Sequence, residues 1–296
     1  KFVPNYVFSE DLAQAKADCG VEAILDKISP DLVVVGIGSP INLENLFLEA
    51  DNRRGIKTVA LEDFQASHNR LCEQPDLLLV SDGYAVKLAV ESYPGINVRT
   101  VGLSAIWHGA VDRKVRDAVD YLRGKHEQVV VYVSGSTMDD LDLLIECMRE
   151  TSGCLIPRLH PKRMGQLYSS ETSDTYGDLW MRRLGKLGDR VENIDMDLPN
   201  LTDQISSCAD VVCSGLSQVL YTSAFQGKIT VSLDTLSSRQ SLKDQTGLPL
   251  PPQVGLGVAR QVEKPCDLSL LKPCRSDQLS LFSASKAAQA ILGLCS

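Results

Sequence analysis

A short basic stretch in the middle of the chain has the residue types needed to bind a phosphate group. An apolar run, Leu155-Ile156, predicts the end of a buried strand, and the ionisable residues after it are Arg158, His160, Lys162 and Arg163. Pro161 favours an extended residue before it and can begin a helix, which would place the last two cations in its first turn. Cations are unfavourable at a helix N-terminus, whereas free N–H groups bind an anion there. The stretch therefore indicates either an anion site or a solvated basic turn.

A second candidate turn lies later in the chain, where Ser214-Gly215-Leu216-Ser217 separates a predicted strand from a predicted helix. The glycine allows a ligand to approach the backbone closely, and the serine hydroxyls can bind phosphate oxygens. Taken alone, the motif is equally typical of a serine helix cap. Because it follows the basic stretch in the same predicted sheet, we expect both turns to line one anion pocket. Its candidate binding residues are Arg158, His160, Lys162, Arg163, Ser214, Gly215, Ser217 and Gln218.

Carboxylates at the end of another predicted strand could serve as a general base. Glu62 and Asp63 follow the strand Ile56–Leu61, and His68 lies about one helical turn beyond them. A carboxylate that faces a phosphate pocket across a cleft can deprotonate an acceptor hydroxyl. Each acid alone can also be interpreted as a helix cap, and Ser81-Asp82 has the same ambiguity. We name Glu62 and Asp63 as the candidate catalytic residues.

The composition argues against several other classes of protein. The 296 residues carry a net charge of −8, which disfavours a nucleic-acid-binding surface. The nine cysteines contain no Cys-x-x-Cys pair and indicate reduced thiols in a cytoplasmic protein. No apolar stretch is long enough to span a membrane, and peripheral membrane contact stays open. The sequence has no zinc-ligand spacing, Walker A motif or Gly-x-Gly-x-x-Gly, so we expect neither a metal nor a cofactor.

Apolar strands alternate with helices along most of the chain, which predicts an α/β fold with parallel sheets covered on both faces. The series breaks near Ile106–Val111, so we expect two Rossmann-like domains that face a cleft, residues 1–107 and residues 108–296. The last helix, Ser283–Leu292, is expected in the second domain. The expected strands are Lys1–Phe8, Asp31–Gly36, Ile56–Leu61, Pro75–Val80, Ile96–Val101, Val129–Val133, Val191–Ile194, Asp210–Cys213 and Lys228–Leu233, and Glu10–Ala17 is expected to be helical.

The order of these motifs resembles that of GT-B glycosyltransferases, which have two Rossmann-like domains. The resemblance covers most of the chain and is carried by Pro157–Lys162, Leu201–Ser217 and Ala224–Leu233. The pair His160-Pro161 is similar to the His-Pro motif of Kdo transferases, bacterial sialyltransferases and glycerophosphotransferases, which use CMP- or CDP-activated donors. The resemblance implies that the phosphates or the cytidine of a donor bind to His160, Lys162, Ser214 and Ser217.

The chain departs from the GT-B pattern in two places. The usual first strand and glycine-rich loop are not found, so about one βα unit of the first domain is missing or displaced. The Glu that commonly binds the donor ribose is also absent, and Gln218 and Tyr221 occupy that neighbourhood. The resemblance implies a glycosyltransferase that transfers a sugar from a nucleotide-activated donor to a hydroxyl acceptor. The alternatives are a nucleotide-sugar 2-epimerase or hydrolase, and a non-catalytic GT-B-like protein that binds a nucleotide or a partner protein.

Overall fold

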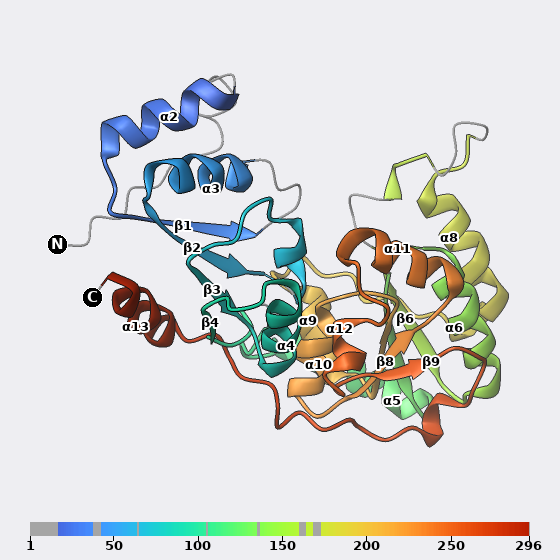
Figure 1. Ribbon diagram of the computed structural model, residues 1–296. Helices are drawn as coiled ribbons and strands as arrows, with labels where there is room; N and C mark the ends of the chain where they lie inside the picture. Colours follow the sequence, from blue (N-terminus) through green and yellow to red (C-terminus); the bar gives the residue numbers. More distant parts are fainter. Residues whose placement is uncertain are drawn as a thin grey trace. The chain divides into compact units, whose positions relative to one another are not determined.

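The computed structural model describes residues 17–37, 43–63, 65–104, 106–134, 137–159, 164–167 and 173–295. The chain forms two compact units, one made of residues 1–104 and 280–296 and the other of residues 105–279 (Figure 1). Each unit has its own parallel β-sheet, which confirms the expected α/β fold with two parallel-sheet domains. The expected strand Lys1–Phe8 lies outside the described residues, as does the expected helix Glu10–Ala17 apart from its last residue.

The first unit contains a four-stranded parallel sheet in the order β1-β2-β3-β4. Its strands are β1 (Leu32–Ile37), β2 (Lys57–Glu62), β3 (Leu77–Val80) and β4 (Val98–Thr100). Each strand lies beside the one before it, so right-handed crossovers place the helices on the same face of the sheet. These helices are α2 (Ala17–Ile28), α3 (Leu43–Arg54), η1 (Ser67–Arg70) and α4 (Gly83–Ser92). The apolar side chains of α2, α3 and α4 share one buried cluster with Val35, Ile37, Ala60, Leu78 and Val80 of the sheet.

Helix α13 (Ala284–Cys295) packs on the opposite face of this first sheet. The segment leading to it runs along the strand end, where Leu103 N donates to Ser280 O at 2.8 Å. Helix α13 thus belongs to the first unit, and not to the second domain as the sequence analysis expected. The physical reason is the apolar second face of the sheet, which needs a cover. Ala287 of the helix completes a buried cluster there with Val59, Leu77, Leu79 and Val101.

The second unit contains a five-stranded parallel sheet in the order β6-β5-β7-β8-β9. Its strands are β5 (Val129–Val133), β6 (Cys154–Arg158), β7 (Val211–Ser214), β8 (Ile229–Leu233) and β9 (Arg260–Val262). The chain adds β6 on one side of β5 and then returns to add the remaining strands on the other side. This reversal places helices on both faces. They are α5 (Arg113–Lys125), α6 (Asp139–Glu150), α8 (Tyr176–Leu184), η2 (Gly185–Arg190), α9 (Leu201–Cys208), α10 (Val219–Phe225), α11 (Leu236–Thr246), α12 (Pro252–Gly255) and η3 (Leu268–Leu270).

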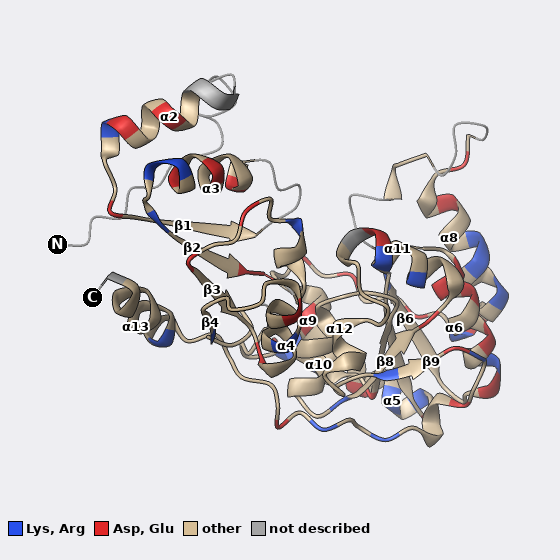
Figure 2. Cartoon of the chain, in the orientation of Figure 1, with Lys and Arg blue, Asp and Glu red and all other residues tan. Residues whose placement is uncertain are grey.

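The middle strands β5, β7 and β8 of this sheet carry no charged side chain, whereas helices α6 and α8 of the same unit carry both acidic and basic residues (Figure 2). Every residue of β7 is buried, and β5 and β8 are buried along nearly their whole length. A strand covered on both faces favours a continuous apolar sequence. This burial is why the sequence located these three strands almost to the residue.

Four elements differ from the sequence expectations. Helix α2, helix α11 and strand β9 were not expected, and Val191–Ile194 forms only a single bridge, between Val191 and Leu155, where a strand was expected. Helix α11 has no apolar periodicity, and its first residue, Leu236, is 84% exposed. Strand β9 has three residues and lies at the sheet edge. Such elements are specified by their neighbours in the fold more than by their own residue pattern.

Candidate functional site

The candidate site lies at the carboxyl ends of β5 and β7 in the second unit. The strand order reverses between these two strands, and ligands of open parallel sheets bind at such a switch point. Small polar residues follow both strands: Ser134 and Thr137 lie between β5 and α6, and Ser214 and Ser217 lie between β7 and α10. The topology therefore places the predicted Ser-Gly turn where a ligand is expected.

The turn after β7 contains a buried hydroxyl without a hydrogen-bond partner among the described residues. It is the Oγ of Ser214, whose side chain is fully buried. Ser232 Oγ of β8 donates to the carbonyl of the adjacent Gly215 at 3.3 Å, which holds the turn against the sheet. An unpaired buried hydroxyl costs about 1–3 kcal/mol. A bound ligand that hydrogen-bonds to Ser214 would remove that cost.

Gly215 is required by its contact with Asp140 of helix α6. A methyl group on Gly215 would overlap the Asp140 carboxylate, so only glycine fits between the turn and the helix. This is the close approach that the sequence analysis expected at Gly215, but the approaching group is a protein carboxylate. Asp140 is itself fully buried, and its Oδ2 has no hydrogen-bond partner in the part of the chain that the structure describes.

The other oxygen of Asp140 joins helix α6 to helix α11. Thr235 Oγ1 donates to Asp140 Oδ1 at 3.0 Å. Thr235 also caps α11 through a reciprocal pair of hydrogen bonds with Ser238. Burial raises the pKa of Asp140 to about 6, although the hydrogen bond from Thr235 acts in the opposite direction. The switch point thus contains a carboxyl group that changes charge near neutral pH.

Ser217 and Gln218 lie at the end of the same turn. The Ser217 hydroxyl accepts from Val219 N at 3.3 Å, and its carbonyl accepts from Gln253 Nε2 at 3.1 Å. Ser217 therefore acts as a local cap as well as a candidate ligand. Gln218 is exposed at the start of α10. These two residues can contact a ligand only at the outer end of the turn.

Arg158 ends strand β6 at the same carboxyl edge, with β5 between it and β7. Its Nη1 donates to Ile194 O at 3.0 Å and its Nε to Thr202 Oγ1 at 3.2 Å. Burial lowers the pKa of Arg158 from its ordinary value, and Asp195 partly offsets that effect. The guanidinium is thus fixed by protein groups beside the switch point. The other basic candidates of this stretch, His160, Lys162 and Arg163, lie outside the described residues, so their place in one pocket stays a prediction.

In the first unit, Glu62 and Asp63 end strand β2 and differ in accessibility. The Glu62 side chain is fully enclosed, and its Oε1 lies 2.7 Å from His68 Nδ1. Burial raises the pKa of Glu62, while the His68 contact lowers it. Asp63 is only partly buried. Of the two candidate bases, Asp63 has the side chain that a substrate can approach.

The nearby Asp82 has the structural role that the sequence analysis allowed for it. Its Oδ1 accepts from Ala85 N at 2.9 Å and caps helix α4. Its Oδ2 accepts from Ser81 Oγ at 2.7 Å and from Gln65 Nε2 at 2.5 Å. Because three neighbouring groups share this carboxylate, Asp82 is a helix cap and not a free base.

Asp140, Thr235 and Ser238 were not predicted as site residues. Asp140 has a sequence signal, because it shares a helical face with Leu144 and Met148, which are both buried. An acid on the apolar face of an amphipathic helix is unusual enough to mark a site. Thr235 and Ser238 had no comparable signal, since helix α11 itself was not expected.

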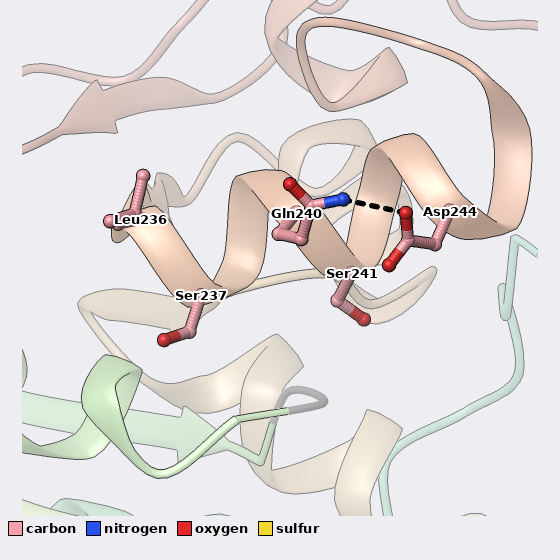
Figure 3. Close-up of a pocket in the computed structure, with 5 residues that line it drawn as sticks. All are labelled: Leu236, Ser237, Gln240, Ser241 and Asp244. Carbon is pink, nitrogen blue, oxygen red and sulfur yellow. Dashed lines mark hydrogen bonds between the residues drawn. The ribbon is translucent and has the colours of Figure 1, made fainter.

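An open surface hollow lies along the outer side of helix α11 (Figure 3). Gln240 Nε2 donates to Asp244 Oδ1 at 2.6 Å along this helix. Ser237 at the other end hydrogen-bonds to Asp139, the neighbour of Asp140. A hydrogen bond between the first turns of α11 and α6 therefore links one lining residue of the hollow, Ser237, to the neighbour of Asp140. Its lining residues are Leu236, Ser237, Gln240, Ser241 and Asp244.

No three His, Cys, Asp or Glu side chains in the described residues are arranged so that they could hold a metal ion. No described helix has the length and hydropathy needed to cross a bilayer.

Comparisons with models of protein families and with curated proteins found no match. Solved structures with the same architecture were found. S. aureus MnaA, solved with UDP, has a TM-score of 0.60 and 12% identity over 100% of this chain and 81% of that chain. UDP-GlcNAc 2-epimerase from Methanocaldococcus jannaschii, solved with UDP-GlcNAc and UDP, has a TM-score of 0.55 and 14% identity over 95% and 79%. A ugt transferase from Siraitia grosvenorii, in complex with UDP, has a TM-score of 0.52 and 11% identity over 94% and 73%.

This chain has the GT-B fold. The sequence analysis inferred the same architecture from the motifs of the second domain, and the structural neighbours confirm it. At sequence identities of 11–14%, the structural similarity shows the fold and does not identify the reaction. The specific similarity of His160-Pro161 to CMP- and CDP-using transferases stays a prediction, because the motif lies outside the described residues.

Proposed function

We propose that the chain is a nucleotide-sugar enzyme that binds its activated sugar at the switch point of the second sheet. The observation that carries this proposal is the buried Ser214 hydroxyl at the carboxyl end of β7, which has no partner in the described part of the chain. It lies in a turn whose close packing needs Gly215, at the location where parallel sheets bind ligands. The solved structures of similar fold contain UDP or UDP-GlcNAc, which supports a nucleotide-sugar ligand.

The diphosphate of the ligand needs donors and positive charge. Ser214 and the backbone N–H groups of its turn supply donors, and Arg158 supplies a cation at the same edge of the sheet, two strands from β7. Lys162 and Arg163 follow Arg158 closely in the sequence and are proposed to complete the charge. A charge-assisted hydrogen bond contributes about 1.5–3 kcal/mol. A few such bonds suffice for micromolar binding.

We propose transfer of the sugar to a hydroxyl acceptor as the reaction. The bond between the anomeric carbon and the phosphate oxygen breaks, the nucleotide leaves, and the acceptor oxygen bonds to the anomeric carbon. A base takes the acceptor proton. Asp63 suits this role better than Glu62, because the Glu62 carboxyl is enclosed and in contact with His68. Epimerisation at the sugar's second carbon is the second candidate, favoured by the epimerase among the structures of similar fold.

A calorimetric titration with CMP, CDP, UMP, UDP and UDP-GlcNAc tests the nucleotide proposal. The His-Pro resemblance predicts tighter binding of the cytidine nucleotides, whereas the ligands of the neighbouring structures favour UDP. Tighter binding of UDP than of CMP and CDP would favour the epimerase reaction. NMR of UDP-GlcNAc incubated with the protein would then detect the 2-epimer.

Binding of none of these nucleotides at millimolar concentration would overturn the nucleotide-sugar proposal. Nucleotide binding without release of nucleotide or change of sugar would favour the non-catalytic alternative. Thermal unfolding gives an independent readout, since a ligand at a hundredfold excess over Kd stabilises the native state by about 2.7 kcal/mol.

A further inference from the structure

Asp140 contacts the turns that follow two neighbouring strands, β7 and β8, at the carboxyl edge of the second sheet. It lies in the first turn of α6, contacts Gly215 after β7, and accepts from Thr235 before α11. Its side chain is fully buried, and Oδ2 has no hydrogen-bond partner in the described ranges. A carboxylate in such a position is costly. Proteins retain such groups mainly where they serve function.

Among the described residues, no Lys or Arg side chain forms an ion pair with Asp140. Asp139, on the same turn, opposes ionisation of Asp140 by repulsion. The β7–α10 turn, Ser214–Gln218, contains no ionisable side chain. The remaining acids nearby are already paired: Asp142 of α6 with Arg183 of α8, and Asp234 before α11 with Arg239.

An anion at the Gly215 turn would therefore lie close to Asp140. If Asp140 is ionised, its negative charge repels the phosphates in a buried environment where screening is weak. If Asp140 is protonated, the repulsion disappears and its O–H becomes a donor. The pKa of Asp140, about 6, means that both forms are accessible near neutral pH.

We propose that Asp140 couples ligand binding at the switch point to the uptake of one proton. This inference rests on the proposed function, because it needs an anionic nucleotide sugar at Gly215. The ligand binds the form of the protein in which Asp140 carries a proton. By linkage, the bound ligand raises the proton affinity of Asp140 by the same factor by which protonation of Asp140 raises the affinity for the ligand. Asp140 is thus a proton-linked positioning residue, since it acts through the Gly215 turn.

The test is the Kd of UDP-GlcNAc measured by calorimetry between pH 5 and pH 8. Both phosphates of this probe are esterified, so its charge stays constant over this range. We expect binding to be about tenfold weaker at pH 8 than at pH 5, the change that corresponds to a shift of one unit in the pKa of Asp140 on binding. The Asp140→Asn variant, which stays neutral, should bind with nearly the same Kd at both pH values. In the wild-type protein, buffers of different ionisation enthalpy should reveal uptake of about half a proton per ligand near pH 6.5, the amount that a one-unit shift produces.

Asp139→Asn is the matched control, because Asp139 is the adjacent but exposed acid of the same turn. It should retain most of the pH dependence. A pH dependence in Asp140→Asn equal to that of the wild-type protein would overturn the inference and leave the proposed function intact. Absence of UDP-GlcNAc binding at every pH would overturn both. Circular dichroism of each variant at pH 5 and pH 8 verifies that the fold is retained.

Discussion

Gly102 lies directly against the main chain of Leu281. A methyl group on Gly102 would overlap the Leu281 carbonyl and lie 2.9 Å from Phe282 N. Gly102 also has a φ of +93°, in the region that favours glycine. This contact holds the segment that carries α13 onto the first unit. The two constraints make position 102 specific for glycine.

We therefore expect Gly102→Ala to destabilise the first unit by about 2–5 kcal/mol, the sum of a left-handed backbone cost and an overpacking cost. Urea unfolding monitored by circular dichroism measures the change. Gly95→Ala is the control, because Gly95 has a φ of +87° and no atom within 4 Å of the added methyl group. Equal losses in the two variants would mean that the Leu281 contact contributes nothing.

Ser214→Ala should weaken nucleotide binding about tenfold or more and stabilise the ligand-free protein by up to about 1–3 kcal/mol, the cost of the unpaired hydroxyl. The Ser214 hydroxyl has no partner to lose in the described structure, whereas a ligand phosphate would lose a charge-assisted bond. Calorimetry gives the affinity and thermal unfolding gives the stability. Ser223→Ala provides the contrast, since Ser223 Oγ donates to Val219 O at 2.8 Å within helix α10. That variant should lose some stability and keep its affinity.

Asp140→Asn should stabilise the protein at pH 7.5 by about 1–3 kcal/mol. The folded pKa of Asp140 is about 6, against an ordinary value of 3.8, so the folded state binds more protons between these values. Wild-type stability must then fall as the pH rises from about 4 to about 6, and the full cost is present above pH 6. The amide variant avoids this cost. Urea unfolding at pH 4 and pH 7.5 should show the gain only at the higher pH, and a gain of equal size at pH 4 would contradict it.

Asp63→Ala should lower turnover by about 10²–10⁴-fold and leave donor affinity nearly unchanged, as expected for loss of a general base. The initial rate of nucleotide release in the presence of acceptor measures the effect. Glu62→Ala should instead lower stability, by about 3–5 kcal/mol, because it leaves His68 buried without its partner. Parental rates in Asp63→Ala would exclude Asp63 as the base.

The parts of the fold that the sequence predicted are those where the residue types of a segment indicate its burial or its turn without reference to distant residues. The valines of β5 and β7 indicate burial on both faces, and Ser214-Gly215 marks a turn at a strand end. Asp140 could not be assigned in this way, because its importance depends on Gly215 and Thr235, which lie 75 and 95 residues further along the chain. The packing of α13 on the first sheet was missed for the same reason. The apolar face of an amphipathic helix indicates that it packs on another element, but it does not indicate on which sheet.

Because α13 packs on the first sheet, the two units are completed during translation in the reverse of the order in which their synthesis begins. Residues 105–279 form the second unit as one continuous segment, so all of it emerges from the ribosome before α13 does. The first sheet, although translated earlier, keeps the apolar face formed by Val59, Leu77 and Leu79 without this helix until α13 emerges. The unit that is translated first is completed last. A chaperone that shields this face during translation would have to act until Ala287 is released.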